Sequence, residues 1–160
     1  MAVLRLILLL AAFLSAAPVA ANDLVGVASV IDADTLEIHG VRIRLHGIDA
    51  PESRQLCTNP SGQQWRCGQQ AALALSDRIG RRTVNCAVRD VDRYDRAIAV
   101  CTQDNHDLNR WLVSEGWAVA YRRYSRDYIG AEDQARRAGR NIWSGQFVMP
   151  WDWRRGQRLP

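Results

Sequence analysis

Acidic residues in this chain are spaced so that folding could gather them at one place. Asp34 lies in an expected turn between two apolar strands, and Asp49 and Glu52 lie just past the end of the next strand. Hairpin pairing between the last two of these strands would bring the three acids together. Carboxylate oxygens suit a hard divalent cation such as calcium or magnesium. Taken singly, each acid is better explained as a turn residue, since Asp is favoured in turns for its local hydrogen bonds.

Two arginines accompany these acids. Arg44 lies on the polar face of the strand that ends just before Asp49, and Arg96 lies at the exit of a second expected hairpin. A guanidinium group has a planar fork of donors that matches phosphate with two hydrogen bonds. Alone, either arginine would be an ordinary solvated residue. With the carboxylates and a cation, they would suit a phosphodiester, whose oxygens gain negative charge during hydrolysis.

Five stretches of the sequence have the pattern of β-strands, and three have helical spacing. Strict alternation of apolar and polar residues from Val41 to Ile48 predicts a strand with one buried and one polar face. The strands are expected at 25–31, 35–39, 41–48, 83–88 and 97–101, and the helices at 69–79, 107–116 and 127–138. Five strands with a helix after the third are typical of small, partly open Greek-key barrels. We therefore predict an α+β fold, dominated by a five-stranded oligonucleotide-binding (OB) fold β-barrel with about three helices packed outside.

Four cysteines predict two disulfides if the protein is exported. Four cysteines allow three connectivities, and strand geometry selects among them. If the second hairpin is symmetric about its central bond, Cys86 and Cys101 face each other, with Cβ atoms about 4.5 to 5.5 Å apart. Cys57 and Cys67 would then close the loop that follows Glu52. Zinc is the competing use of four cysteines, but the chain has no Cys-x-x-Cys pair.

The first 21 residues have the features of a secretory signal peptide. One positive charge at Arg5 precedes the apolar run Leu6 to Leu14, and small residues follow up to Ala21. The apolar run is shorter than the roughly 20 residues of a membrane-spanning helix. We expect cleavage after Ala21 and a mature chain that is periplasmic or secreted, monomeric and not stably associated with the membrane.

The remaining length fits one domain with a short tail. We expect a domain at 22–146 and a basic, aromatic tail at 147–160, in which Trp151 and Trp153 neighbour Arg154 and Arg155. The two tryptophans would either stack on nucleic-acid bases or fold back on the barrel. All 21 basic residues are arginine, yet a formal net charge of +4 is by itself weak support for an anionic ligand.

Four segments, in order and in register, resemble the signature segments of the staphylococcal nuclease (thermonuclease) family. They are Ile31–Thr35, Arg44–Glu52, Asp92–Arg96 and Asn141–Ser144. The resemblance extends from about Val25 to Ser144, and the cysteines fit a secreted Gram-negative branch of the family. One departure is Asp95, where many relatives carry glycine. It adds a negative charge beside Arg96 and permits positive φ less readily than glycine does.

The resemblance implies a role for each matching residue. Asp34 and Asp49 match calcium-binding carboxylates, and Ala50 matches the residue whose backbone carbonyl completes the metal shell. Glu52 matches the carboxylate drawn as general base, and Arg44 and Arg96 match the pair that grips the scissile phosphate. Tyr94 and Tyr121 fall near tyrosines that pack on the bound nucleotide.

These observations predict a metal-dependent nuclease acting on DNA, RNA or both outside the cytoplasm, with calcium (Ca2+) or another hard divalent cation as cofactor. One alternative is a non-catalytic OB-fold module that binds nucleic acid. Such a module would be expected to lose Glu52 or an arginine, and this chain retains them. A second alternative is an envelope or polysaccharide-associated protein.

Overall fold

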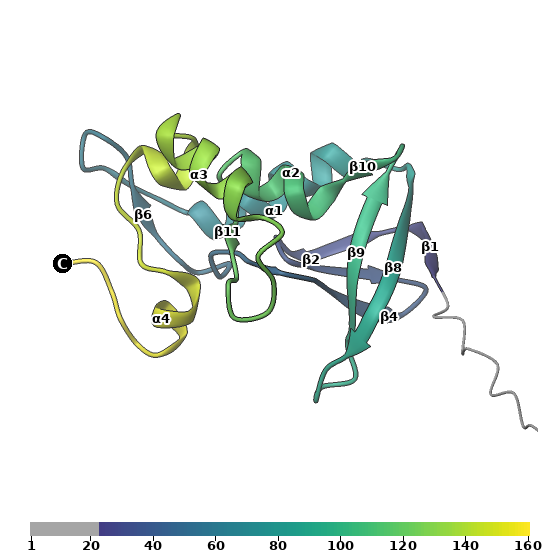
Figure 1. Ribbon diagram of the computed structural model, residues 1–160. Coiled ribbons are helices and arrows are strands. Elements are labelled where there is room, and N and C mark those ends of the chain that lie inside the picture. The colour runs from purple at the N-terminus through teal and green to yellow at the C-terminus, as the bar shows by residue number, and fades with distance from the viewer. Residues whose placement is uncertain (1–22) are drawn as a thin grey trace, which may run out of the picture.

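The structure, a computed structural model, describes residues 23–160, so the predicted signal peptide at 1–21 lies outside the described residues. A curled sheet has helices packed along one side, and its longest hairpin projects at one end (Figure 1). The C-terminal segment lies at the opposite end of the molecule. In the part of the chain described, every helix is too short or too polar to cross a membrane.

The main sheet contains seven strands. Their order is β1 (Leu24–Val27), β8 (Thr83–Val91), β9 (Ala97–Gln103), β4 (Val41–Leu45), β3 (Thr35–Ile38) and β2 (Ser29–Asp32), with β10 (His106–Asp107) paired to β9. Two small ladders accompany it, β5 (Ile48–Asp49) with β11 (Val119–Ala120), and β6 (Cys57–Thr58) with β7 (Gln64–Trp65). The helices are α1 (Cys67–Ile79), α2 (Leu108–Ser114), α3 (Ile129–Arg137), the 3₁₀ helix η1 (Asn141–Ser144) and α4 (Pro150–Arg154).

The predicted α+β fold of OB type is confirmed, with differences in detail. The strand expected at 41–48 ends at Leu45, and Ile48–Asp49 forms the separate strand β5, which pairs with β11. The strand expected at 25–31 divides at Ala28 into β1 and β2, which pair with β8 and β3 respectively. A strand that changes partners lets the sheet curl into a partial barrel. A further difference is α4, which sequence periodicity did not predict because it has only five residues. Pro150 occupies its first turn, where proline is tolerated because the missing N–H would be unpaired.

The cysteine pairing is confirmed. Cys86 faces Cys101 across β8 and β9, and the structure joins both Cys86–Cys101 and Cys57–Cys67. The symmetric register does not extend to the tip of the hairpin. It shifts by one residue between Val88 and Asp90, which is a β-bulge.

Two hydrophobic clusters hold these elements together. The larger lies between the sheet and helices α1, α2 and α3, with Leu36, Ile43 and Leu75 fully buried. The smaller cluster has a buried centre of Cys57, Cys67, Val119 and Ile142, packed against Trp65, Trp143, Phe147, Met149 and Trp151. Because three of these side chains come from 147–160, the tail is packed onto the domain. Of the two expectations for Trp151, folding back on the barrel is the one observed.

Candidate active site

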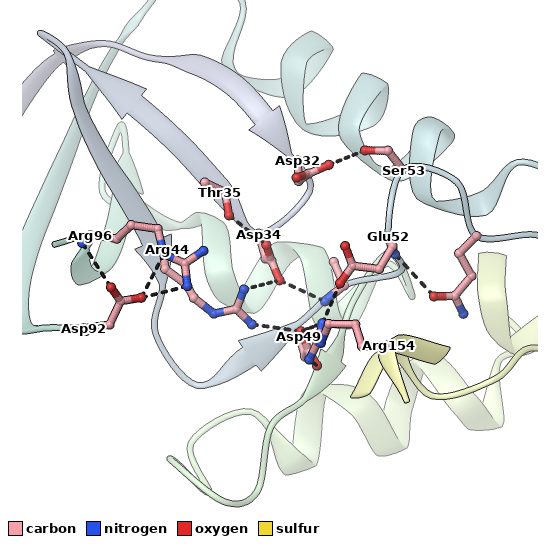
Figure 2. Close-up of polar contacts among 12 residues, drawn as sticks. Asp32, Asp34, Thr35, Arg44, Asp49, Glu52, Ser53, Asp92, Arg96 and Arg154 are labelled. Atoms are coloured by element: carbon pink, nitrogen blue, oxygen red, sulfur yellow. Dashed lines mark hydrogen bonds and ion pairs between the residues drawn. The ribbon is translucent and has the colours of Figure 1, made fainter. Parts of the chain in front are cut away.

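Pairing of β3 with β4 brings Asp34 and Arg44 together. Thr35, which follows Asp34, faces Arg44 in the ladder. Arg44 spans two carboxylates: its Nη1 lies 3.1 Å from Asp34 Oδ2, and its Nη2 lies 2.9 Å from Asp49 Oδ1. One guanidinium therefore fixes two acids that are distant in sequence, as Figure 2 shows.

Both carboxylates are buried and held by further hydrogen bonds. Asp34 accepts from Thr35 Oγ1 at 3.0 Å and from the backbone N–H of Ala50 at 3.3 Å. Asp49 is fully buried. Burial, with the neighbouring Asp34 carboxylate, raises the pKa of Asp49 above its ordinary value, although hydrogen bonds from arginine oppose the rise. Although burial opposes the charge of Arg44, Asp34 and Asp49 raise the pKa of its guanidinium.

Glu52 follows β5 in a loop whose backbone is fixed from two directions. The fully buried side chain of Gln55 accepts a hydrogen bond from the Glu52 N–H at 3.3 Å, and the Gln55 N–H donates to the Glu52 carbonyl at 2.7 Å. Helix α1 approaches from the other side. A Cβ on Gly68 would lie 1.8 Å from the carbonyl oxygen of Glu52, so only glycine permits this approach.

Arg96 is held by an acid of its own hairpin. Its Nε and Nη2 lie 2.8 and 2.7 Å from Asp92 Oδ2, while Asp92 Oδ1 accepts the backbone N–H groups of Tyr94 and Arg96. Partial burial opposes ionisation of Asp92, but these hydrogen bonds lower its pKa. Ala97, the first residue of β9, faces Ile43 of β4, so Arg96 directly precedes the strand that pairs with the strand of Arg44. In the described chain, the ion pair of Arg96 is with Asp92, not with the three site acids.

The two tyrosines of the predicted site differ in exposure. Tyr94 is 65% exposed at the hairpin tip, with the guanidinium carbons of Arg93 and Arg96 at 4.8 and 5.5 Å from its ring centroid. Tyr121 is half-buried and stacks on Trp151, with ring centroids 5.4 Å apart and an interplanar angle of 9°. The Tyr94 ring is therefore accessible to a nucleotide, whereas Trp151 already covers one face of the Tyr121 ring.

Arg154, in α4, is a site residue that the sequence did not identify. Its Nη2 lies 2.6 Å from Asp49 Oδ2, and its Nη1 lies 3.1 Å from Asp49 Oδ1 and 2.6 Å from Glu52 Oε1. Although burial opposes its charge, these hydrogen bonds raise the pKa of Arg154. Figure 2 shows the side chain extending from α4 toward both acids. The only local signal was the aromatic and basic composition of the tail, which does not indicate where the tail packs.

Known proteins are similar to this chain in sequence. A family model described as staphylococcal nuclease homologue matches residues 42–145, more than half of the chain. The chain belongs to the staphylococcal nuclease family. The matched range contains Arg44, Asp49, Glu52 and Arg96, whereas Asp34 and Arg154 lie outside it.

Individual relatives carry different names. The chain is 39% identical over 130 residues to a succinoglycan biosynthesis protein, ExoI, of Rhizobium meliloti, covering 79% of this chain and 68% of that protein. It is 31% identical over 141 residues to an uncharacterized endonuclease of Haemophilus influenzae, covering 83% and 74%. It is 32% identical over 151 residues to a micrococcal nuclease of Shigella flexneri, covering 82% and 80%.

The donor chemistry fits the cation that the staphylococcal nuclease family implies. Asp34 and Asp49 supply carboxylate oxygens on two sides of Arg44, and hard cations prefer oxygen ligands. Across residues 23–160, however, no three acidic, histidine or cysteine side chains are already grouped as a metal cluster. A cation would therefore share Asp49 with Arg44 and Arg154.

Proposed function

We propose that this protein is a metal-dependent nuclease, with calcium or another hard divalent cation as cofactor, that hydrolyses phosphodiester bonds of DNA, RNA or both. The observation that carries the proposal is the buried Asp34–Arg44–Asp49 cluster, with the Glu52 carboxylate joined to it through Arg154. Family membership and the nuclease names among the relatives support the same class of reaction.

Each site residue has a role in this proposal. Asp34, Asp49 and the backbone carbonyl of Ala50 would hold the cation, which when bound supplies positive charge to the phosphoryl oxygens. Arg44 and Arg96 bind the scissile phosphate through their forked donors. Glu52, whose side chain is 32% exposed, accepts a proton from the attacking water. Tyr94 and Tyr121 pack against the nucleotide, Tyr94 through its exposed ring.

We propose that the reaction takes place outside the cytoplasm, in a periplasmic or secreted monomer. Two disulfides support this location, because disulfides persist in oxidising compartments. The working unit would be the domain 22–146 with the tail 147–160 packed on it.

A second candidate is a role in polysaccharide synthesis, which the relative named as a succinoglycan biosynthesis protein favours. A non-catalytic nucleic-acid-binding module is the third. Neither candidate explains why Asp34, Arg44 and Asp49 are buried together, at some cost in desolvation, beside a partly exposed carboxylate.

The test is digestion of single- and double-stranded DNA and of RNA by the mature protein, with calcium, with magnesium and with a chelator. Glu52→Gln is measured alongside, and Asp77→Asn, an exposed change on α1, is the matched control. We expect metal-dependent cleavage that Glu52→Gln abolishes and Asp77→Asn leaves intact. A folded protein that binds nucleic acid without cutting it under any of these conditions would overturn the proposal in favour of a binding module.

A further inference from the structure

We infer that Arg154 is a positioning residue of the active site, which fixes the Glu52 carboxylate and shares Asp49 with the metal ion. The inference rests on the proposed nuclease function and assigns a role to a residue outside the range of the family match. It is carried by the contacts of one guanidinium with two acids of different proposed function.

The guanidinium of Arg154 bridges the carboxylates of Asp49 and Glu52. It forms a two-pronged pair with Asp49, at 2.6 and 3.1 Å, and the Nη1 of that pair also lies 2.6 Å from Glu52 Oε1. A planar guanidinium with two donors on one carboxylate has little freedom to rotate. The third contact therefore fixes the position of Glu52 relative to Asp49.

The segment that carries Arg154 is firmly packed. Trp151 stacks on Tyr121 in the turn of the helix before Arg154, and Pro150 is buried. Just before α4, the carbonyl of Val148 accepts a hydrogen bond from Gln55 Nε2 at 2.6 Å. Since Gln55 also holds the backbone of Glu52, the tail and the Glu52 loop are joined at two points, Gln55 and Arg154.

The position of the Glu52 carboxylate depends on Arg154 more than that of Asp49 does. Asp49 is fully buried and is also held by Arg44, whereas the Glu52 side chain is 32% exposed. In the described chain, the only charged partner of the Glu52 carboxylate is Arg154. Without it, a glutamate on a loop would be free to adopt several rotamers. Misplacing a reacting group by about 1 Å can cost on the order of 10²-fold in rate.

The same guanidinium should weaken metal binding. A cation held by Asp34 and Asp49 would lie close to the positively charged guanidinium of Arg154, which is paired with Asp49. Arg154 thus favours catalysis through Glu52 while opposing the metal through Asp49. These opposite effects distinguish a positioning residue from one that only stabilises the fold, whose loss would weaken metal binding and catalysis together.

The experiment compares Arg154→Met with the matched control Arg155→Met, whose side chain is 72% exposed and pairs only with Asp152 among the described residues. Calcium affinity is measured by calorimetry on the full mature protein without substrate, and kcat on DNA at saturating calcium. For Arg154→Met we expect kcat to fall by about tenfold to 10²-fold while the calcium Kd falls severalfold. Arg155→Met should match the wild type in both.

Three results would overturn the inference. An unchanged kcat in Arg154→Met would exclude the positioning role. An increased kcat would show that the tail inhibits the enzyme. A weaker calcium affinity together with a lower kcat would indicate that Arg154 only stabilises the fold. Arg154→Lys covers the case in which the methionine variant does not fold. It keeps the charge but loses the fork, so calcium affinity should stay near wild type while kcat still falls. A wild type that never cuts would refute the nuclease proposal itself, which is a separate outcome.

Discussion

The buried carboxylate of Asp49 accepts two hydrogen bonds from Arg154, at 2.6 and 3.1 Å, although 105 residues separate the two in sequence. The C-terminal helix therefore completes a cluster that begins in the first hairpin of the barrel. An unpaired buried charge is strongly unfavourable. Asp49 retains Arg44 as a second partner, so loss of either arginine leaves one ion pair in place.

We predict that Arg44→Lys lowers nuclease activity by on the order of 10² to 10³ with little change in melting temperature. Arg44 reaches Asp34 through Nη1 and Asp49 through Nη2, and a single ammonium group cannot reproduce that fork. The retained charge, with Arg154 still on Asp49, preserves the neutralisation of the cluster. Cleavage rates and thermal unfolding check this. Arg42→Lys, an exposed change on the same strand, is the control, and equal activity in Arg44→Lys would exclude the assigned role.

Asp95→Gly should both stabilise the hairpin and strengthen substrate binding. Asp95 has φ of +58°, a conformation in which glycine has no steric penalty, and it places a negative charge beside Arg96. We expect a gain of up to about 1 kcal/mol in the free energy of unfolding and a lower KM for DNA. The control is Asn105→Gly, which relieves a similar φ of +62° in another turn without changing charge near Arg96. It should raise stability and leave KM unchanged. A KM for Asp95→Gly equal to or above that of the wild type would show that the Asp95 charge does not weaken substrate binding.

The ion pair between Asp92 and Arg96 should make the free energy of unfolding depend on pH. The pKa of Asp92 is lowered in the folded protein from an ordinary value near 3.8, so the folded state gains stability from its ionised form. That gain is present above about pH 4 and is lost as the pH falls through the folded-state pKa. Asp92→Asn should therefore be less stable than the wild type at pH 7, with the difference shrinking toward pH 3.

Chemical unfolding measured across this pH range checks the expectation. Asp90→Asn is the control, because Asp90 is exposed and its side chain accepts only the N–H of Val91 among the described hydrogen bonds. If the difference between Asp92→Asn and the wild type stayed constant with pH, the ion pair would not be its source.

The sequence predicted those features that depend on neighbours along the chain. The alternation that predicted a strand at 41–48 is local, and the structure has that strand over Val41–Leu45, with a turn at His46 and Gly47 before β5. The helix expected from 107 is also local, and it begins where the Asp107 carboxylate accepts the Arg110 N–H at 2.9 Å. The division at Ala28 was missed, because a change of strand partner leaves no mark on the period-two pattern. Arg154 was missed for a related reason: its place depends on Trp151 docking on Tyr121, which is a tertiary contact.

Gly68→Ala tests whether the close approach of α1 fixes Glu52. In an ordinary helix, replacing glycine by alanine is favourable by about 1 kcal/mol. Here the added Cβ would lie 1.8 Å from the carbonyl oxygen of Glu52 and 2.8 Å from that of Pro51, so either the helix or the loop must move. Such overpacking typically costs about 1–3 kcal/mol, and it would displace Glu52, the proposed acceptor of the proton from the attacking water.

We therefore expect Gly68→Ala to lower the melting temperature and to reduce kcat by on the order of 10²-fold, with calcium affinity less affected, since Asp34 and Asp49 lie outside the contact. Gly130→Ala is the matched control, because a Cβ at that position on α3 would meet nothing within 4 Å. It should raise the melting temperature slightly and leave kcat unchanged. A Gly68→Ala variant as stable and as active as Gly130→Ala would show that the loop carrying Glu52 adapts without loss, and that its position is set by Gln55 and Arg154 alone.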